Sequence, residues 1–214
     1  MNNKLPIVGS REERAFFMPD IRAEESGNVV EGHAAVFGQA YEYAFWTETI
    51  ARGAFDKTDF SDVLFCINHD TSKIPLARSR NNNDNSTLHL SVDDQGLKTR
   101  AVLDIENNVE AKALRSSIMR GDISGMSYIF SVRNDEWQDV NTDHPKRLIT
   151  DIAKIWETGA VSFPANPGTD ISARSNDALE SAQKVLESAR ARAKELDSSA
   201  EVEILKLKNE ILSK

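Results

Sequence analysis

The chain has 214 residues, of which 40% are hydrophobic, and a formal net charge of −8. This length suffices for one sizeable domain with an appendage, and the hydrophobic content suffices to bury a core. No apolar run approaches the roughly 18–20 residues that span a membrane. The N-terminus, "MNNKLPIVGSREER", lacks the apolar segment of a secretory signal. Lys and Arg form no dense stripe, so the composition does not indicate nucleic-acid binding.

Short alternating or apolar runs, bounded by turn residues, predict a chain rich in strands. The predicted strands lie at residues 28–38, 62–70, 87–103 (two strands around "DDQG"), 123–132 and 148–169 (a strand pair). Residues 107–122 carry apolar side chains at helical spacing, and Gly121 is a natural helix stop. The polar segments 77–86 and 133–147 predict loops, the second as an irregular hairpin tip. Residues 45–55 show no clear periodicity.

The composition changes at Asp170, since residues 170–214 contain no Gly, no Pro and no aromatic residue. Apolar residues at 3–4 spacing predict a helical run up to Leu196 and a second from Ile204, interrupted by "DSS" at 197–199. Two interpretations stay open, a solvated helical tail and a partner-binding coiled coil. Both predict a domain of residues 1–169 followed by a helical tail of residues 170–214.

Two serines lie close together in the motif "DISGMSYIF". Side chains of a strand alternate between its two faces. Ser124 falls on a bulky face that should pack into the core, with Met126, Tyr128, Phe130 and Val132. Ser127 falls on a smaller face that leaves room beside it, with Ile123, Gly125, Ile129 and Ser131. Ser127 is therefore the better candidate nucleophile, although most serines in strands are structural.

A serine nucleophile needs a base near neutral pH, and histidine is the usual one. Of the four histidines, His33 and His89 lie within alternating strands, and His144 lies in a polar loop. His69 differs because it follows the apolar run "DVLFCIN", where a strand opens into a loop and can present a side chain to a cleft. The structural alternative is a strand-terminal histidine that bonds to Asp70 or to the backbone.

A third group usually orients the base, and Glu157 in "KIWETGAVSFPA" is the candidate. It shares a face with apolar residues, where a carboxylate is costly to bury without a partner. At an exposed strand edge it would be inert. Cys66 competes as a nucleophile in "CINH", but strand alternation points it away from His69, so we interpret it as a buried small apolar residue. As the single cysteine it also excludes an internal disulfide and a multi-cysteine zinc site. No metal-ligand spacing or phosphate-binding glycine loop is present.

The sequences of seven segments, and their order along the chain, resemble those of the prohead proteases of tailed bacteriophages. The segments span about residues 13–170 and read "VVEGHAAVFG", "WTETIARGAF", "DVLFCINHD", "IPLARS", "TLHLSVDDQGL", "SIMRGDISGMSYIF" and "ETGAVSFPANPGT". The resemblance implies a serine endopeptidase with an α+β fold, namely a β-barrel-like core with flanking helices that is similar to the herpesvirus assembly proteases. The "NHD" segment places the family's histidine at His69, "GMS" its serine at Ser127, and the segment before "FPANP" its acidic member at Glu157.

Three segments depart from the pattern of that family. A glycine often follows two residues after the serine, where this chain has Ile129. Leu-Gly-Arg often follows the histidine, where this chain has Ala77 in the middle position. Val-Ser usually follows the acidic residue, where this chain has Thr158 and Gly159. These changes are expected to alter the substrate cleft or the site that stabilises the oxyanion.

The resemblance also implies a biological role. Enzymes of this kind cleave scaffold and capsid-protein segments inside the immature capsid, which implies action in the host cytoplasm within the assembling prohead. The implied partners are the major capsid protein and scaffold segments, and related viral proteases suggest a homodimer by analogy. No cofactor, nucleic acid or membrane is expected. A second hypothesis is a non-enzymatic capsid assembly or scaffolding protein, with a protease-like domain and the helical tail as its contact.

Overall fold

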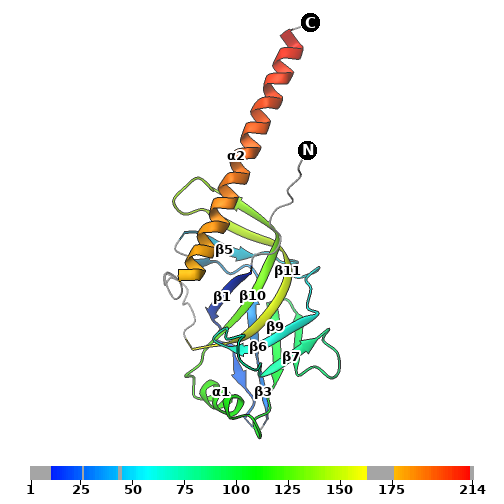
Figure 1. The fold of residues 1–214 in the computed structure, drawn as a ribbon, viewed down its shortest axis with the longest axis vertical. Coiled ribbons are helices and arrows are strands. Elements are labelled where there is room, and N and C mark those ends of the chain that lie inside the picture. The colour runs from blue at the N-terminus through cyan, green and yellow to red at the C-terminus, as the bar shows by residue number, and fades with distance from the viewer. Residues whose placement is uncertain (1–10, 26, 43–44, 163–175, 213–214) are drawn as a thin grey trace.

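The computed structural model describes residues 11–25, 27–42, 45–162 and 176–212. Two helices accompany the strands, α1 (Val109–Met119) and α2 (Asn176–Leu212) (Figure 1). The strands are β1 (Glu12–Phe17), β2 (Arg22–Ala23), β3 (Val29–Val36), β4 (Tyr41–Glu42), β5 (Thr47–Ile50), β6 (Asp62–Ile67), β7 (Ala77–Arg80), β8 (Leu88–Val92), β9 (Gly96–Val102), β10 (Gly125–Gln138) and β11 (Lys146–Val161).

The strands form two sheets, and the larger one is organised around β10 and β11. Strand β10 pairs with β1 on one edge and with β11 on the other. The far edge of β11 pairs in parallel with β5 near its start and with β6 near its end. The smaller sheet has the order β2-β3-β9-β8. The α+β class is confirmed, but the described strands leave both sheets open, so the expected barrel closure is not found.

The long β10–β11 hairpin differs from the predicted pair of shorter elements. The polar residues 133–138, predicted as part of a loop, continue strand β10, and β11 is a single strand of 16 residues. Their exposed, alternating side chains belong to the solvated end of the hairpin, where polarity does not end a strand. The segment 77–86 was likewise predicted as a loop, yet its first four residues form the edge strand β7.

Helix α1 begins and ends as its sequence indicates. The side chain of Asn108 accepts hydrogen bonds from the backbone N–H groups of Glu110 and Ala111, which caps the first turn. Gly121 follows the helix with a φ of 78°, a left-handed conformation that favours glycine. Leu114 and Ile118 face the core. The predicted helix is therefore confirmed with slightly shorter bounds.

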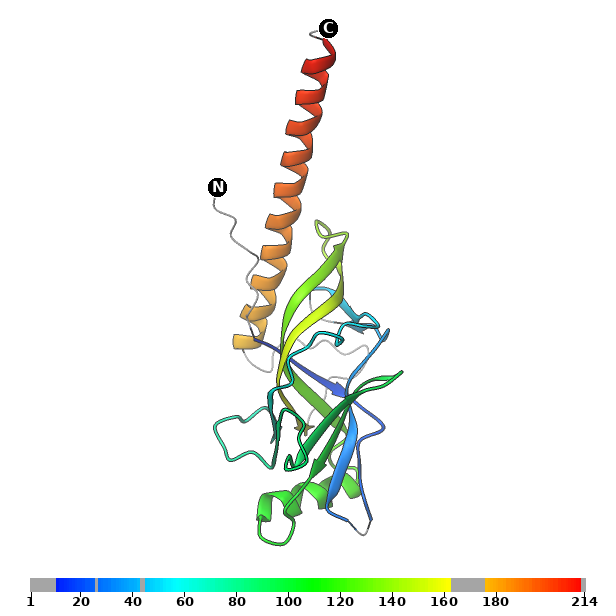
Figure 2. The same ribbon diagram turned by 90° about the vertical axis from the view of Figure 1, so that its right-hand side faces the viewer.

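Helix α2 is one continuous helix of 37 residues, so the predicted interruption at 197–199 is wrong. The hydroxyls of Ser198 and Ser199 donate to the carbonyl oxygens of Glu195 and Leu196, each at 2.9 Å. These bonds let two polar residues stay within the helix. Near its start the helix packs on the domain, and beyond this contact it projects away (Figures 1 and 2). None of the described helices is long and apolar enough to cross a membrane.

The core contains the face of β10 that alternation predicts. Met126, Tyr128 and Phe130 are fully buried there. Ser124, which was assigned to the same face, lies before the first residue of β10 and is only half-buried. Alternation does not extend to it because the strand begins one residue later.

A cluster of buried charges joins β1, β5 and the hairpin at the end far from α1. Arg14 and Arg147 both hydrogen-bond to Glu12 and Glu48, at 2.6–2.9 Å. Burial acts to raise the pKa of Glu12, but the two arginines lower it from 4.5 to about 2. Glu12 therefore stabilises the fold above about pH 4.5, and that contribution is lost as the pH falls toward 2.

Arg147→Met should lower the free energy of unfolding by about 3–5 kcal/mol at neutral pH, because the buried carboxylates of Glu12, Glu48 and Asp135 each lose a charged partner. Arg78→Met is the matched control, since the Arg78–Asp62 pair is 40% and 47% exposed. Its loss should cost less than about 1 kcal/mol. Urea denaturation of both variants measures the difference, and equal losses would contradict a structural role for the buried cluster.

Candidate active site

His69 is positioned by the turn that follows strand β6. The chain leaves β6 at Ile67, and Asn68 and His69 adopt left-handed backbone conformations with φ of 53° and 60°. The N–H of Asn68 donates to the carbonyl of Ala160 at 2.9 Å, and its side-chain oxygen accepts from the N–H of Ser162 at 2.9 Å. These bonds fasten the turn to the end of β11, which holds His69 beside that strand.

Glu157 lies on β11 and meets this histidine directly. Its Oε2 is 2.9 Å from Nδ1 of His69, and its side chain is fully buried. The two residues are 88 positions apart in sequence, and the parallel pairing of β6 with β11 brings them together. The predicted base and acidic residue are therefore in contact.

Ser127 lies on the neighbouring strand, on the same face as Glu157. The β10–β11 register places Ser127 opposite Gly159 and Ile129 opposite Glu157. A Cβ added at Gly159 would collide with Oε1 of Glu157 and with the carbonyl of Cys66. The carboxylate thus occupies the space above Gly159, next to Ser127. Oγ of Ser127 is buried and has no hydrogen-bond partner among the described residues, so the serine is close to the His69–Glu157 pair without being bonded to His69.

Burial sets the electrostatics of this pair. Ile129, the departure noted in the sequence, is 6% exposed and lies directly across from Glu157, where it excludes water. Burial raises the pKa of Glu157, and the hydrogen bond with His69 only partly opposes this. Burial acts to lower the pKa of His69, but the hydrogen bond and the charge of Glu157 outweigh it and raise that pKa above 6.5.

The other candidates stand apart from this arrangement. Cys66 is buried, as predicted, and burial raises the pKa of its thiol to about 12, so it stays protonated. His33 of β3 contacts Asp20 and Asp93, which lie just outside the strands of the smaller sheet, and His144 contacts Glu42 near the hairpin tip. Within the described ranges, no group of three or more His, Cys, Asp or Glu side chains could hold a metal ion.

Sequence reasoning missed two supporting residues. The left-handed backbone of Asn68 and its bonds to the end of β11 depend on pairing between distant segments. Asparagine at the end of an apolar run was the one local signal, because it tolerates this conformation better than most residues. Gly159 was noted only as a departure, and its contact with Glu157 becomes visible only in the folded sheet.

Comparison with known proteins gives two matches. The sequence pattern of a family described as "Caudovirus prohead serine protease" matches residues 18–184. The chain is also 27% identical over 161 residues to the "Prohead protease" of Enterobacteria phage HK97. That alignment covers 73% of this chain and 65% of the HK97 protein, slightly less than two thirds of it. No solved structure gives a significant match.

If neutral His69 is the base, kcat/KM should rise with pH through a value above 6.5, since the neutral form predominates only above the raised pKa. Glu157→Gln should move this acid limb to lower pH, because the carboxylate that favours the charged imidazole is gone. It should also lower kcat by about 10²–10⁴-fold. Peptide hydrolysis measured from pH 5 to 9 gives both quantities, and an unshifted limb would contradict the assigned pairing.

Gly159→Ala should lower kcat/KM by at least about tenfold, because the new methyl group must displace the Glu157 carboxylate or strand β6. Gly38→Ala is the control for backbone strain alone, since a Cβ added there would contact nothing and only the φ of 70° disfavours alanine. It should cost stability without changing the pH profile. Unaltered kinetics in Gly159→Ala would contradict the described packing of the site.

Proposed function

Because the chain belongs to the caudovirus prohead serine protease family, we propose that it is a serine endopeptidase that cleaves scaffold and capsid-protein segments during phage prohead maturation. Its place of action would be the assembling prohead in the host cytoplasm. The observation that carries the proposal is the 2.9 Å contact of His69 with Glu157, on the strand face that also holds Ser127. The family membership follows from the sequence and the His69–Glu157 contact from the folded structure, so the two observations support each other.

The proposed reaction gives each side chain a distinct role. The N–H at Nδ1 of His69 donates a hydrogen bond to Glu157, which leaves Nε2 with a lone pair that can accept the proton of the Ser127 hydroxyl. His69 accepts that proton as Oγ attacks a peptide carbonyl carbon, and then donates it to the leaving amine. Glu157 orients the ring and stabilises its charged form. Water, activated by His69, hydrolyses the acyl-enzyme, and no cofactor is needed.

A second candidate is a non-enzymatic capsid assembly protein that keeps a protease-like domain. It is favoured by one observation, the complete burial of Ser127 without a hydrogen bond to His69. Hydrogen bonds at catalytic sites are often long in unliganded enzymes and tighten when substrate binds. The enzyme proposal therefore requires that substrate binding brings Ser127 into contact with both the base and the peptide.

Ser127→Ala should abolish cleavage of co-expressed capsid and scaffold proteins, a loss of about 10⁴-fold or more in purified protein. Ser124→Ala is the matched control, because Ser124 lies three residues away and outside the strand, and it should cleave normally. Gel mobility and mass spectrometry of the partners give the readout. Intact partners with the unmodified protein would favour the assembly role, and cleavage by Ser127→Ala would exclude the proposed nucleophile.

A further inference from the structure

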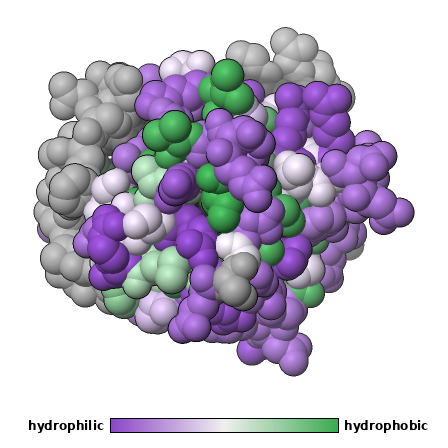
Figure 3. Space-filling model, turned by 90° about the horizontal axis from the view of Figure 1, so that it is seen from below, coloured by the Kyte–Doolittle hydropathy of each residue, from purple (hydrophilic) through white to green (hydrophobic). Residues whose placement is uncertain are grey.

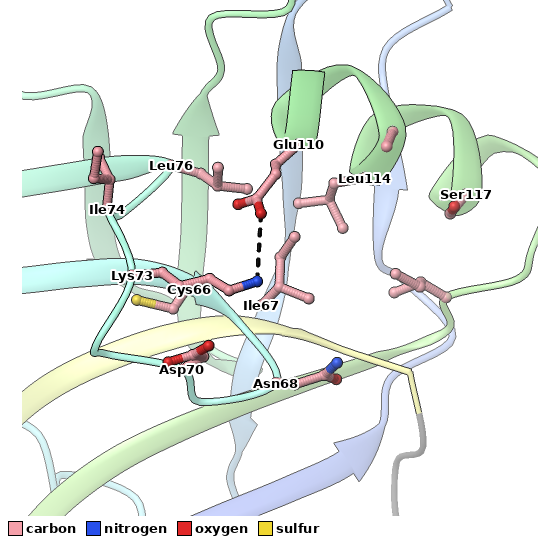
Figure 4. A pocket seen from close by; sticks show the side chains of 12 residues that line it. Cys66, Ile67, Asn68, Asp70, Lys73, Ile74, Leu76, Glu110, Leu114 and Ser117 are labelled. Carbon is pink, nitrogen blue, oxygen red and sulfur yellow. Dashed lines mark hydrogen bonds and ion pairs between the residues drawn. The ribbon is translucent and has the colours of Figure 1, made fainter. Parts of the chain in front are cut away.

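A pocket of about 290 Å³ lies between the loop that follows β6 and helix α1 (Figure 4). Asn68 and Asp70, the two neighbours of His69 in sequence, both line it. Ile123, which precedes the strand that carries Ser127, lines it as well. The pocket is therefore continuous with the elements that position the proposed base and nucleophile, although neither of those two side chains belongs to its wall.

Six of the twelve residues that line this pocket are aliphatic. Ile67 at the end of β6, with Ile74 and Leu76 of the following loop, lies across the pocket from α1, which contributes Ala113 and Leu114. Ile74 is 85% exposed, which leaves a large aliphatic side chain uncovered at the mouth. Figure 3 views the molecule from the α1 end, where apolar side chains gather in the middle of a polar face. An apolar surface in an open pocket of this kind favours an apolar occupant.

The charged groups at the pocket already have partners. Nζ of Lys73 donates to Oε1 of Glu110 at 3.3 Å, which links the loop to α1 across the opening (Figure 4). The carboxylate of Asp70 accepts from the hydroxyl and the N–H of Ser72. With two carboxylates and one ammonium group, the lining carries one excess negative charge, which disfavours an acidic occupant.

The size of the pocket limits what it can hold. A volume of about 290 Å³ lies just below the roughly 300–1,000 Å³ of small-molecule sites. That space suits one or two residues of an extended peptide. We infer that the pocket is a specificity subsite, which takes a bulky aliphatic side chain of the peptide substrate close to the cleaved bond. This inference rests on the proposed protease function and adds the class of residue that the enzyme prefers.

Ala113 offers a direct test, because it is exposed on α1 and lines the pocket. Ala113→Phe should fill the pocket without entering the core. Lys112→Phe is the matched control, since it places the same side chain one position away, outside the pocket lining. Ile74→Ser is a second variant, at a side chain so exposed that the fold should be preserved. Each full-length protein is incubated with a library of randomised decapeptides, and the cleavage sites are identified by mass spectrometry.

The unmodified protein should enrich Leu, Ile, Val or Met at one position relative to the cleaved bond. Ala113→Phe should lower kcat/KM for such peptides by about tenfold or more and shift the preference to Gly or Ala. Ile74→Ser should weaken the aliphatic preference several-fold, and Lys112→Phe should retain it. A preference for basic or acidic residues at that position, or an unchanged preference in both pocket variants, would overturn the inference.

A separate measurement distinguishes failure of the subsite from failure of the enzyme. Diisopropyl fluorophosphate, a small reagent for activated serines, is added to each variant, and the modified peptide is identified. Modification at Ser127 in all variants, together with unchanged cleavage preference, would reject the subsite alone. If the unmodified protein neither reacts at Ser127 nor cleaves any peptide, the protease function is rejected and the subsite with it.

Discussion

The antiparallel pairing of β10 with β11 is the interaction on which the rest of the structure depends. Its register sets Ser127 opposite Gly159 and Glu157 opposite Ile129, so two distant segments present their polar groups on one face. The outer edges of the same pair hold β1 on one side and β5 and β6 on the other. A shift of β11 by one residue would move Glu157 to the opposite face of the sheet, away from Ser127. The candidate site and the core are thus specified by a single register.

The site itself balances desolvation against pairing. A fully buried carboxylate is unfavourable unless a partner compensates for the lost water. Here His69 supplies a hydrogen bond to Oε2 of Glu157, while Ile129 and the sheet exclude solvent from the rest of the carboxylate. A glycine at position 129 would leave this side of Glu157 more open. The isoleucine therefore strengthens the interaction of Glu157 with His69, and it need not indicate a weakened site.

The sequence was most informative where periodicity and local geometry agree. Alternation in β10 placed Met126, Tyr128 and Phe130 in the core and separated Ser127 from them, and Asn108 and Gly121 bounded helix α1. Prediction from the sequence failed where contacts between distant residues or side-chain hydrogen bonds decide the local structure. The polar end of β10 is a strand because β11 pairs with it. The serines of α2 remain helical because their hydroxyls donate hydrogen bonds to backbone carbonyls. The buried ion cluster has no local signature, since its members come from three separate segments.

Helix α2 gives the domain a fixed reach. Arg190 bonds to the tip of the hairpin at Val140 and Arg192 bonds to Asp135 of β10, and from there the helix runs on to Leu212, about 30 Å at 1.5 Å per residue. From the same end of the hairpin, β11 leads from Arg147 to Glu157, roughly another 33 Å at 3.3 Å per residue. Both spans are continuous secondary structure. A body attached to the far end of α2 would therefore stay at a nearly constant separation from the candidate site.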